Sequence, residues 1–132
     1  MRPAMDDAAL HTAMQAQRTI SGELTEILDL TEQLKDAFSR QDQVSVELFL
    51  DLRQKAIDRV QTCREELTQL LRSLPQPQQT VLRQLLSGAA PQTTETEPLA
   101  RLVHQNHRLL ERVQQADRTL SLRAGGPQSF YR

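Results

Sequence analysis

The sequence predicts an all-α protein, an elongated antiparallel bundle of three long helices with one short helix, and three observations support this prediction. Apolar residues recur at alternating steps of three and four along most of the 132 residues, which is the period of one helix face. Aromatic residues make up only 3% of the chain, so the bulky side chains of a rounded core are scarce. Proline and glycine gather at a few points, which divide a single domain, 1–132, into helices at 6–40, 45–74, 78–87 and 98–124.

The first helix, 6–40, is the longest. Asp6 and Asp7 place negative charge at its start, where the helix dipole favours it. No proline interrupts the segment, and at ~1.5 Å per residue it extends on the order of 50 Å. Its apolar face, repeating at three and four, consists of Leu10, Ala13, Gln17, Ile20, Leu24, Ile27, Thr31, Leu34 and Phe38.

The second helix, 45–74, follows the short polar segment 40–43, so the two helices are expected to form an antiparallel hairpin. Ser45 is a typical residue for its start. Pro75 and Pro77 end it, because the residue before a proline is pushed out of the helical region. Its apolar face consists of Phe49, Leu52, Ala56, Val60, Cys63, Leu67, Leu70 and Leu74.

A short helix at 78–87 is closed by Gly88, and the small polar residues of 88–97 form a linker to the last helix. The last helix, 98–124, begins with a proline, which is tolerated in a first helical turn. The tail 125–132 begins with two glycines and a proline that end this helix, and it carries the adjacent aromatic residues Phe130 and Tyr131.

The last helix has the pattern most typical of a partner-binding surface. Its residues repeat at steps of three and four, as in a coiled-coil seam, and Val103 and Leu110 widen this seam into a stripe. The helix therefore has more apolar surface than a single two-stranded contact needs. Asn106, at a seam position, is expected to fix register or partner choice. The predicted partner-binding residues are Leu99, Leu102, Asn106, Leu109, Leu110, Val113, Ala116 and Leu120.

Composition excludes several classes of function. The formal net charge of −1 provides no strong basic field for nucleic-acid binding. The longest apolar run, Leu48-Phe49-Leu50, is too short for a signal peptide or a membrane helix, so a soluble, cytoplasmic protein without membrane insertion is expected. Cys63, the only cysteine, cannot form an internal disulfide and is expected to be a buried structural thiol.

No catalytic, cofactor-binding or metal-binding residues are predicted. His104, His107 and Glu111 form the only cluster of metal-ligand type, but no further ligand completes it and a solvated helix flank accounts for it. The sequence has no phosphate-binding glycine loop and no Ser/His/Asp arrangement supported by strands. An enzyme is therefore not expected.

Two features, the pair of N-terminal helices and the separate last helix, carry a resemblance to a known family. The sequences LTEILDLTEQLKDAF and LDLRQKAIDRVQTCREEL form the pair of N-terminal helices, and LARLVHQNHRLLERV has an Asn before a Leu pair. In this layout the chain resembles the FlgN-type flagellar export chaperones of bacteria. The resemblance implies a cytoplasmic chaperone that binds the helical termini of hook–filament junction proteins and delivers them to the type III export apparatus. It places the cargo site at the last helix, around Leu102, Asn106, Leu109, Leu110, Val113, Ala116 and Leu120.

Two alternative functions stay open at the level of sequence. A structural coiled-coil protein would satisfy the same apolar stripes by self-association, as a homodimer, and a helical regulator would bind another flagellar component or part of the export apparatus. The last helix also carries more bases than acids, whereas the first carries more acids than bases. These bases either attract an acidic partner or complement the first helix, and the second interpretation is the preferred one.

Overall fold

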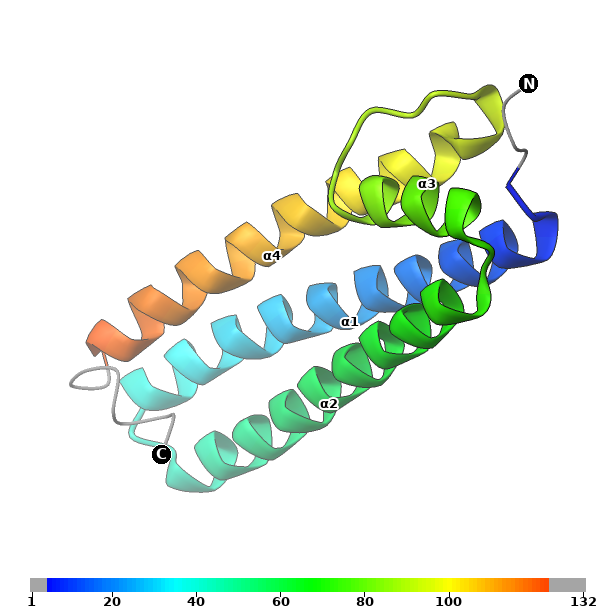
Figure 1. The fold of residues 1–132 in the computed structure, drawn as a ribbon. Coiled ribbons are helices and arrows are strands. Elements are labelled where there is room, and N and C mark those ends of the chain that lie inside the picture. Colours follow the sequence, from blue (N-terminus) through cyan, green and yellow to red (C-terminus); the bar gives the residue numbers. More distant parts are fainter. Residues whose placement is uncertain (1–4, 124–132) are drawn as a thin grey trace.

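The computed structural model describes residues 5–123 and has the predicted all-α fold (Figure 1). Its long helices are α1 (Asp7–Ser39), α2 (Gln43–Ser73) and α4 (Glu97–Arg123), and α3 (Gln76–Leu86) is the short one. A 3-10 turn, η1 (Thr94–Thr96), leads into α4. The predicted last helical residue, Ala124, and the tail 125–132 with Phe130 and Tyr131 lie outside the described residues.

Three helices begin earlier than the sequence predicts, α4 by one residue and α2 and α3 by two, and local hydrogen bonds explain the difference for α2. The carboxylate of Asp42 accepts a hydrogen bond from the Ser45 backbone N–H at 3.1 Å and another from the Ser45 hydroxyl at 2.6 Å. Asp42 is therefore the N-cap, and Ser45 lies inside the first turn. Similarly, α3 starts at Gln76 because Pro77 is accommodated within its first turn.

The central element of the fold is α1, which packs along both α2 and α4 (Figure 1). Helix α2 runs antiparallel to its neighbours, as expected for a helical hairpin. Helix α3 and the linker return the chain to the end at which α1 begins, so α4 runs in the same direction as α1. The closest helix packing is that of α1 with α2 and with α4, whereas α2 and α4 do not pack along each other.

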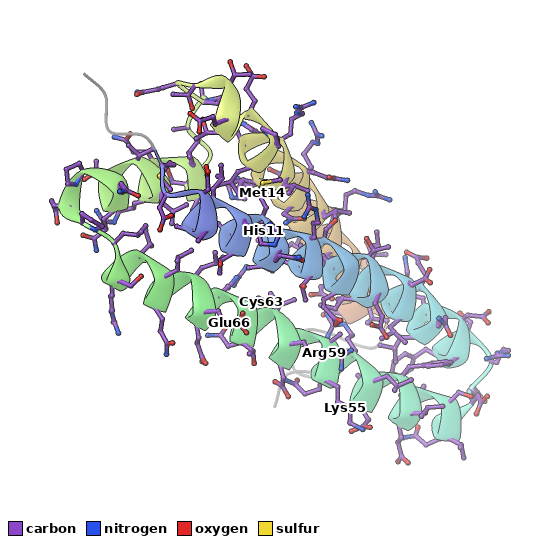
Figure 2. All side chains as sticks on the ribbon, turned by 90° about the vertical axis from the view of Figure 1, so that its right-hand side faces the viewer. His11, Met14, Lys55, Arg59, Cys63 and Glu66 are labelled. Carbon is purple, nitrogen blue, oxygen red and sulfur yellow. The ribbon has the colours of Figure 1, made fainter. Side chains whose placement is uncertain are left out.

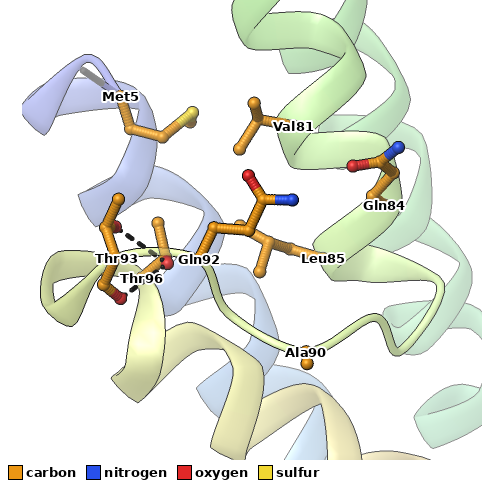
Figure 3. A pocket seen from close by; sticks show the side chains of 8 residues that line it. All are labelled: Met5, Val81, Gln84, Leu85, Ala90, Gln92, Thr93 and Thr96. Atoms are coloured by element: carbon orange, nitrogen blue, oxygen red, sulfur yellow. Dashed lines mark hydrogen bonds between the residues drawn. The ribbon is translucent and has the colours of Figure 1, made fainter. Parts of the chain in front are cut away.

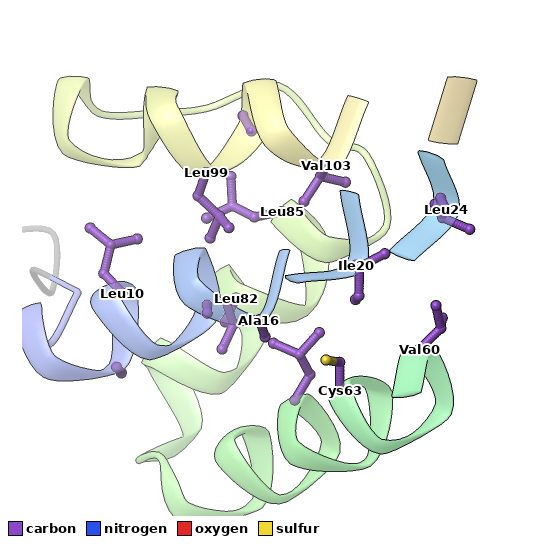
Figure 4. Packing of buried hydrophobic residues seen from close by; sticks show 14 of the residues in the cluster. Leu10, Ala16, Ile20, Leu24, Val60, Cys63, Leu82, Leu85, Leu99 and Val103 are labelled. Carbon is purple, nitrogen blue, oxygen red and sulfur yellow. The ribbon is translucent and has the colours of Figure 1, made fainter. Parts of the chain in front are cut away.

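The core is divided into two apolar clusters. The larger cluster extends from the end of the bundle that contains α3 to beyond its middle. At the α3 end, Leu82 and Leu85 of α3 reach Ala16 of α1 and Leu99 and Val103 of α4 (Figure 4). The smaller cluster lies near the α1–α2 connection and consists of Leu34, Ala37, Val46 and Leu120. Burial of these side chains provides the main stabilisation of the bundle.

A polar layer lies between the two clusters. Arg53, with 6% of its surface exposed, donates from Nε to the hydroxyl of Thr31 at 3.2 Å and from Nη2 to the carboxylate of Asp117. The Thr31 hydroxyl donates in turn to the Ile27 carbonyl at 2.7 Å. This layer joins α1, α2 and α4, and it penalises any register in which the buried guanidinium loses its partners.

Cys63 is buried between α1 and α2 (Figure 2), in agreement with the prediction of a structural thiol. Burial raises the pKa of the Cys63 thiol, and the charges of Glu66 and Glu23 raise it further. At the surface of the same pair of helices, Arg59 Nε lies 2.8 Å from a carboxylate oxygen of Glu23. Among the helices within 5–123, none is long and apolar enough to cross a membrane.

Candidate functional site

Most of the predicted partner-binding residues of α4 pack against α1 of the same chain. Leu99, Asn106, Val113, Ala116 and Leu120 are buried, with at most 8% of their surface exposed. The apolar surface of α4 is therefore largely covered within the molecule. The three members that stay half-buried are Leu102, Leu109 and Leu110.

Asn106 bonds to α1 of the same chain and so fixes the register of α4 against α1. The sequence predicted that Asn106 fixes register or partner choice. Its Nδ2 donates to the backbone carbonyl of Gln17 at 2.8 Å and to the side-chain oxygen of Gln17 at 2.7 Å. The backbone carbonyl can only accept, so this contact fixes the orientation of the Asn106 amide. The remaining oxygen, Oδ1, is buried and has no hydrogen-bond partner among residues 5–123.

Leu110 lines a groove between α2 and α4, with α1 as its floor. It comprises two hollows, of about 280 Å³ and about 180 Å³. The hollows share Leu24, Arg64 and Leu110, one residue from each long helix, so they join into one depression that we call the α2–α4 groove.

Each long helix contributes a set of residues to the α2–α4 groove. The floor, from α1, consists of Gln17, Ile20, Leu24 and Ile27. The α2 wall consists of Arg53, Ile57, Val60, Gln61, Arg64, Leu67, Thr68 and Leu71, and the α4 wall of Asn106, His107, Leu110, Val113, Gln114 and Asp117. Of the eight residues predicted to bind a partner, only Asn106, Leu110 and Val113 line this groove.

Both ends of the groove are closed. At one end α3 packs between α2 and α4, and its Leu86 side chain lines the larger hollow. At the other end the contact between Arg53 and Asp117 bridges the two walls. The groove is thus open only to the solvent-facing side, between these two limits.

The α2 wall was not predicted as part of a binding surface. One stripe along α2 consists of residues spaced seven apart: Leu50, Ile57, Arg64 and Leu71. In the structure the three apolar residues of this stripe are half-buried and Arg64 is exposed. The sequence signal for the α2 wall was this second stripe, which lies beside the apolar face that packs on α1.

The charges of α4 do not complement those of α1 through ion pairs. Among the side chains described, the acids of α1 pair with Arg59 of α2, with Lys35 of α1 itself or with Arg40 just after α1, and no ion pair joins α1 to α4. Arg112 shares a hollow of about 470 Å³ with Asp29 and Glu32 of α1 without reaching ion-pair distance. The preferred interpretation of these bases is therefore not supported by direct contacts.

A smaller hollow of about 110 Å³ lies beneath the linker (Figure 3). It is lined by Met5, by Val81 and Leu85 of α3 and by linker residues, and the Thr93 and Thr96 hydroxyls are 3.0 Å apart beside it. This volume is far below that of a helix, so it is not a second helix-binding site.

The histidines of α4 lie on its exposed side. His104, His107 and Glu111 are all exposed, and residues 5–123 contain no group of three or more His, Cys, Asp or Glu side chains placed to hold a metal ion. His107 lies at the rim of the α2–α4 groove, close to Gly88 at the end of α3.

Comparison of the chain with protein-family models, with curated proteins and with solved structures gives no match.

Proposed function

We propose that this protein is a non-enzymatic helix-binding chaperone that takes an amphipathic helix of its cargo into the α2–α4 groove. By the resemblance described above, the cargo is a hook–filament junction protein of the bacterial flagellum, bound through its helical terminus in the cytoplasm. The chaperone then delivers it to the type III export apparatus. The observation that carries this proposal is the groove itself, an apolar slot between two helices that do not pack on each other.

Helix α3 supports the proposal because it occupies one end of the same slot. It is an amphipathic helix of 11 residues that inserts Leu82 and Leu85 between α2 and α4, where these side chains are 0% and 3% exposed. The spacing of the walls therefore admits a helix at that end of the slot. A guest helix would continue in the position that α3 begins to fill.

The dimensions of the groove suit a guest of three to five turns. At ~1.5 Å per residue, the α4 wall from Asn106 to Asp117 extends roughly 16 Å and the α2 wall from Arg53 to Leu71 roughly 27 Å. A guest of this length presents about three to five large apolar side chains at a spacing of 3.6 residues per turn. Their burial is worth about 5 to 15 kcal/mol before ordering costs, which is compatible with micromolar affinity.

The test is a titration of the purified protein with peptides that span the terminal helices of the hook–filament junction proteins of the same organism. Leu110→Glu and Ile57→Glu place a charge on opposite walls of the groove, at half-buried positions. Each is expected to weaken binding by at least ~30-fold, because about 2 kcal/mol or more of apolar contact is lost. Circular dichroism checks that both variants keep the helix content of the native protein.

Leu48→Glu is the matched control, because Leu48 is 52% exposed and lines neither hollow of the groove. It is expected to bind the peptides as the native protein does. Unchanged affinity in both groove variants would refute the assignment of the site. Absence of binding together with a stable dimer in solution would favour the self-associating alternative, and selective binding of a non-filament flagellar component would favour the regulator.

A further inference from the structure

Arg64 occupies the middle of the α2–α4 groove. It is one of three residues that line both hollows. It lies between the apolar residues Ile57 and Leu71 on the same stripe of α2. Its side chain is exposed and makes no hydrogen bond or ion pair with any residue of 5–123. The groove thus presents one uncompensated positive charge on an otherwise largely apolar surface.

The groove contains no carboxylate that is available to this charge. Asp117 is the only acidic residue among those that line the two hollows, and it is engaged by Arg53 at the closed end. Gln17 and Asn106, which bond to each other, also line the groove, and the remaining polar side chains there, apart from Arg53, are Gln61, Thr68, His107 and Gln114. None of these supplies a negative charge.

A guest helix that covers the groove removes water from around Arg64. A cation that loses its hydration without gaining a partner is strongly destabilised, and this loss would offset much of the gain from apolar contacts. A carboxylate on the guest compensates it, because a guanidinium and a carboxylate form paired, charge-assisted hydrogen bonds. The electrostatics of the groove therefore select among amphipathic helices that have the same apolar pattern.

We propose that the α2–α4 groove recognises an amphipathic helix whose apolar stripe is interrupted near its middle by one Asp or Glu, which pairs with Arg64. This inference rests on the proposed function, since it presupposes a guest helix in the groove. Arg64, Gln17 and Asn106 line the same hollow and form one polar level in it. A single polar level within an apolar seam fixes the register of the helices that meet there.

The experiment uses two synthetic amphipathic peptides of about 18 residues, the length that matches the longer wall. They share one Leu/Ile stripe and differ only at its central position, which is Glu in one peptide and Gln in the other. Dissociation constants are measured for the native protein, for Arg64→Gln and for Arg64→Glu. The terminal-helix peptides of the proposed cargo are titrated in parallel.

The native protein is expected to bind the Glu peptide at least ~10-fold more tightly than the Gln peptide, in the range measured for close charge pairs at interfaces. Arg64→Gln should reduce this preference to less than about twofold and Arg64→Glu should reverse it. The preference should also decline as salt is raised. Arg108→Gln is the matched control, because Arg108 is exposed on α4, lines neither hollow, and should leave the preference unchanged.

Equal binding of both peptides to the native protein, or the same preference in Arg64→Gln, would overturn this inference and would mean that the Arg64 side chain extends out to water when the groove is covered. The groove itself would remain a helix-binding site in that case. Failure of the native protein to bind the designed peptides and the cargo peptides alike would instead refute the proposed function, and the inference with it.

Discussion

Removal of the Asp117 carboxylate is expected to be one of the most destabilising single changes outside the apolar clusters. Asp117→Ala leaves the guanidinium of Arg53 buried, with only 7% of that side chain exposed and its partner on α4 gone. The hydrogen bond from Arg53 to Thr31 persists, but the Thr31 hydroxyl carries no compensating charge. The substitution therefore takes a negative charge away from a buried cation.

The expected cost follows from the burial of the pair. Removing one partner of a buried ion pair costs about 3 to 5 kcal/mol. The Asp117 side chain is 26% exposed, so water partly compensates its loss, and we expect the lower end of that range, about 3 kcal/mol. Replacement of both partners, as in the double variant Arg53→Met and Asp117→Ala, should return the stability to within about 1 kcal/mol of the native value.

Urea unfolding followed by circular dichroism measures these differences, provided that the slope of the transition is the same for all variants. Asp58→Ala is the control, because this carboxylate only accepts a surface hydrogen bond from Gln54 at 3.0 Å and its loss should change the stability by no more than about 0.5 kcal/mol. A cost below about 1 kcal/mol for Asp117→Ala, or a double variant no more stable than the single one, would refute the argument that the pair must be lost or kept as a unit.

Three further outcomes are expected. Because burial raises the pKa of Cys63, its thiol should react with Ellman's reagent only as the protein unfolds, and immediately in denaturant; fast reaction of the native protein would contradict its placement in the core. The pKa of Asp42 is lowered from its ordinary 3.8, chiefly by the hydrogen bond from the Ser45 hydroxyl and also by the one from the Ser45 backbone N–H. The Asp42 carboxylate therefore stabilises the fold fully above pH 3.8, and this stabilisation is lost as pH falls through the pKa of the folded state. Thermal melting from neutral to strongly acidic pH should therefore show a shallower acid decline in Asp42→Ala than in the native protein. Gly88→Ala should destabilise by about 1 to 3 kcal/mol, because φ is +103° there and the new Cβ would lie 3.3 Å from the His107 ring; an unchanged urea midpoint would show that the end of α3 adapts freely.

The helices could be predicted from the sequence because periodicity reports directly which face of a helix is apolar. The repeat that begins at Leu10 and ends at Phe38 became α1, and Pro75 ended α2 close to the predicted place. The start of α2 was misplaced because both Asp42 and Ser45 are good cap residues, and only their mutual hydrogen bonds show which one is outside the helix.

Periodicity could not predict which element packs on each apolar face. The stripe of α4 was expected to meet a partner, yet Leu99 and Leu120 are fully buried within the chain. Conversely, Ile57 and Leu71 of α2 line the α2–α4 groove although they lie outside the apolar face predicted for this helix. A repeat of three and four specifies that a face needs a neighbour, but the neighbour depends on the direction in which α3 and the linker return the chain.

The direction of α3 has a consequence for the polarity of anything that lies in line with it. Its carboxyl-terminal turn, which ends at Leu86, points along the α2–α4 groove. The carbonyl groups of such a turn carry partial negative charge. An incoming segment that meets this turn with its amino-terminal end brings N–H groups of opposite partial charge, whereas the reverse orientation opposes two like ends. Electrostatics at this junction therefore favours a guest helix that runs through the α2–α4 groove parallel to α1 and antiparallel to α2.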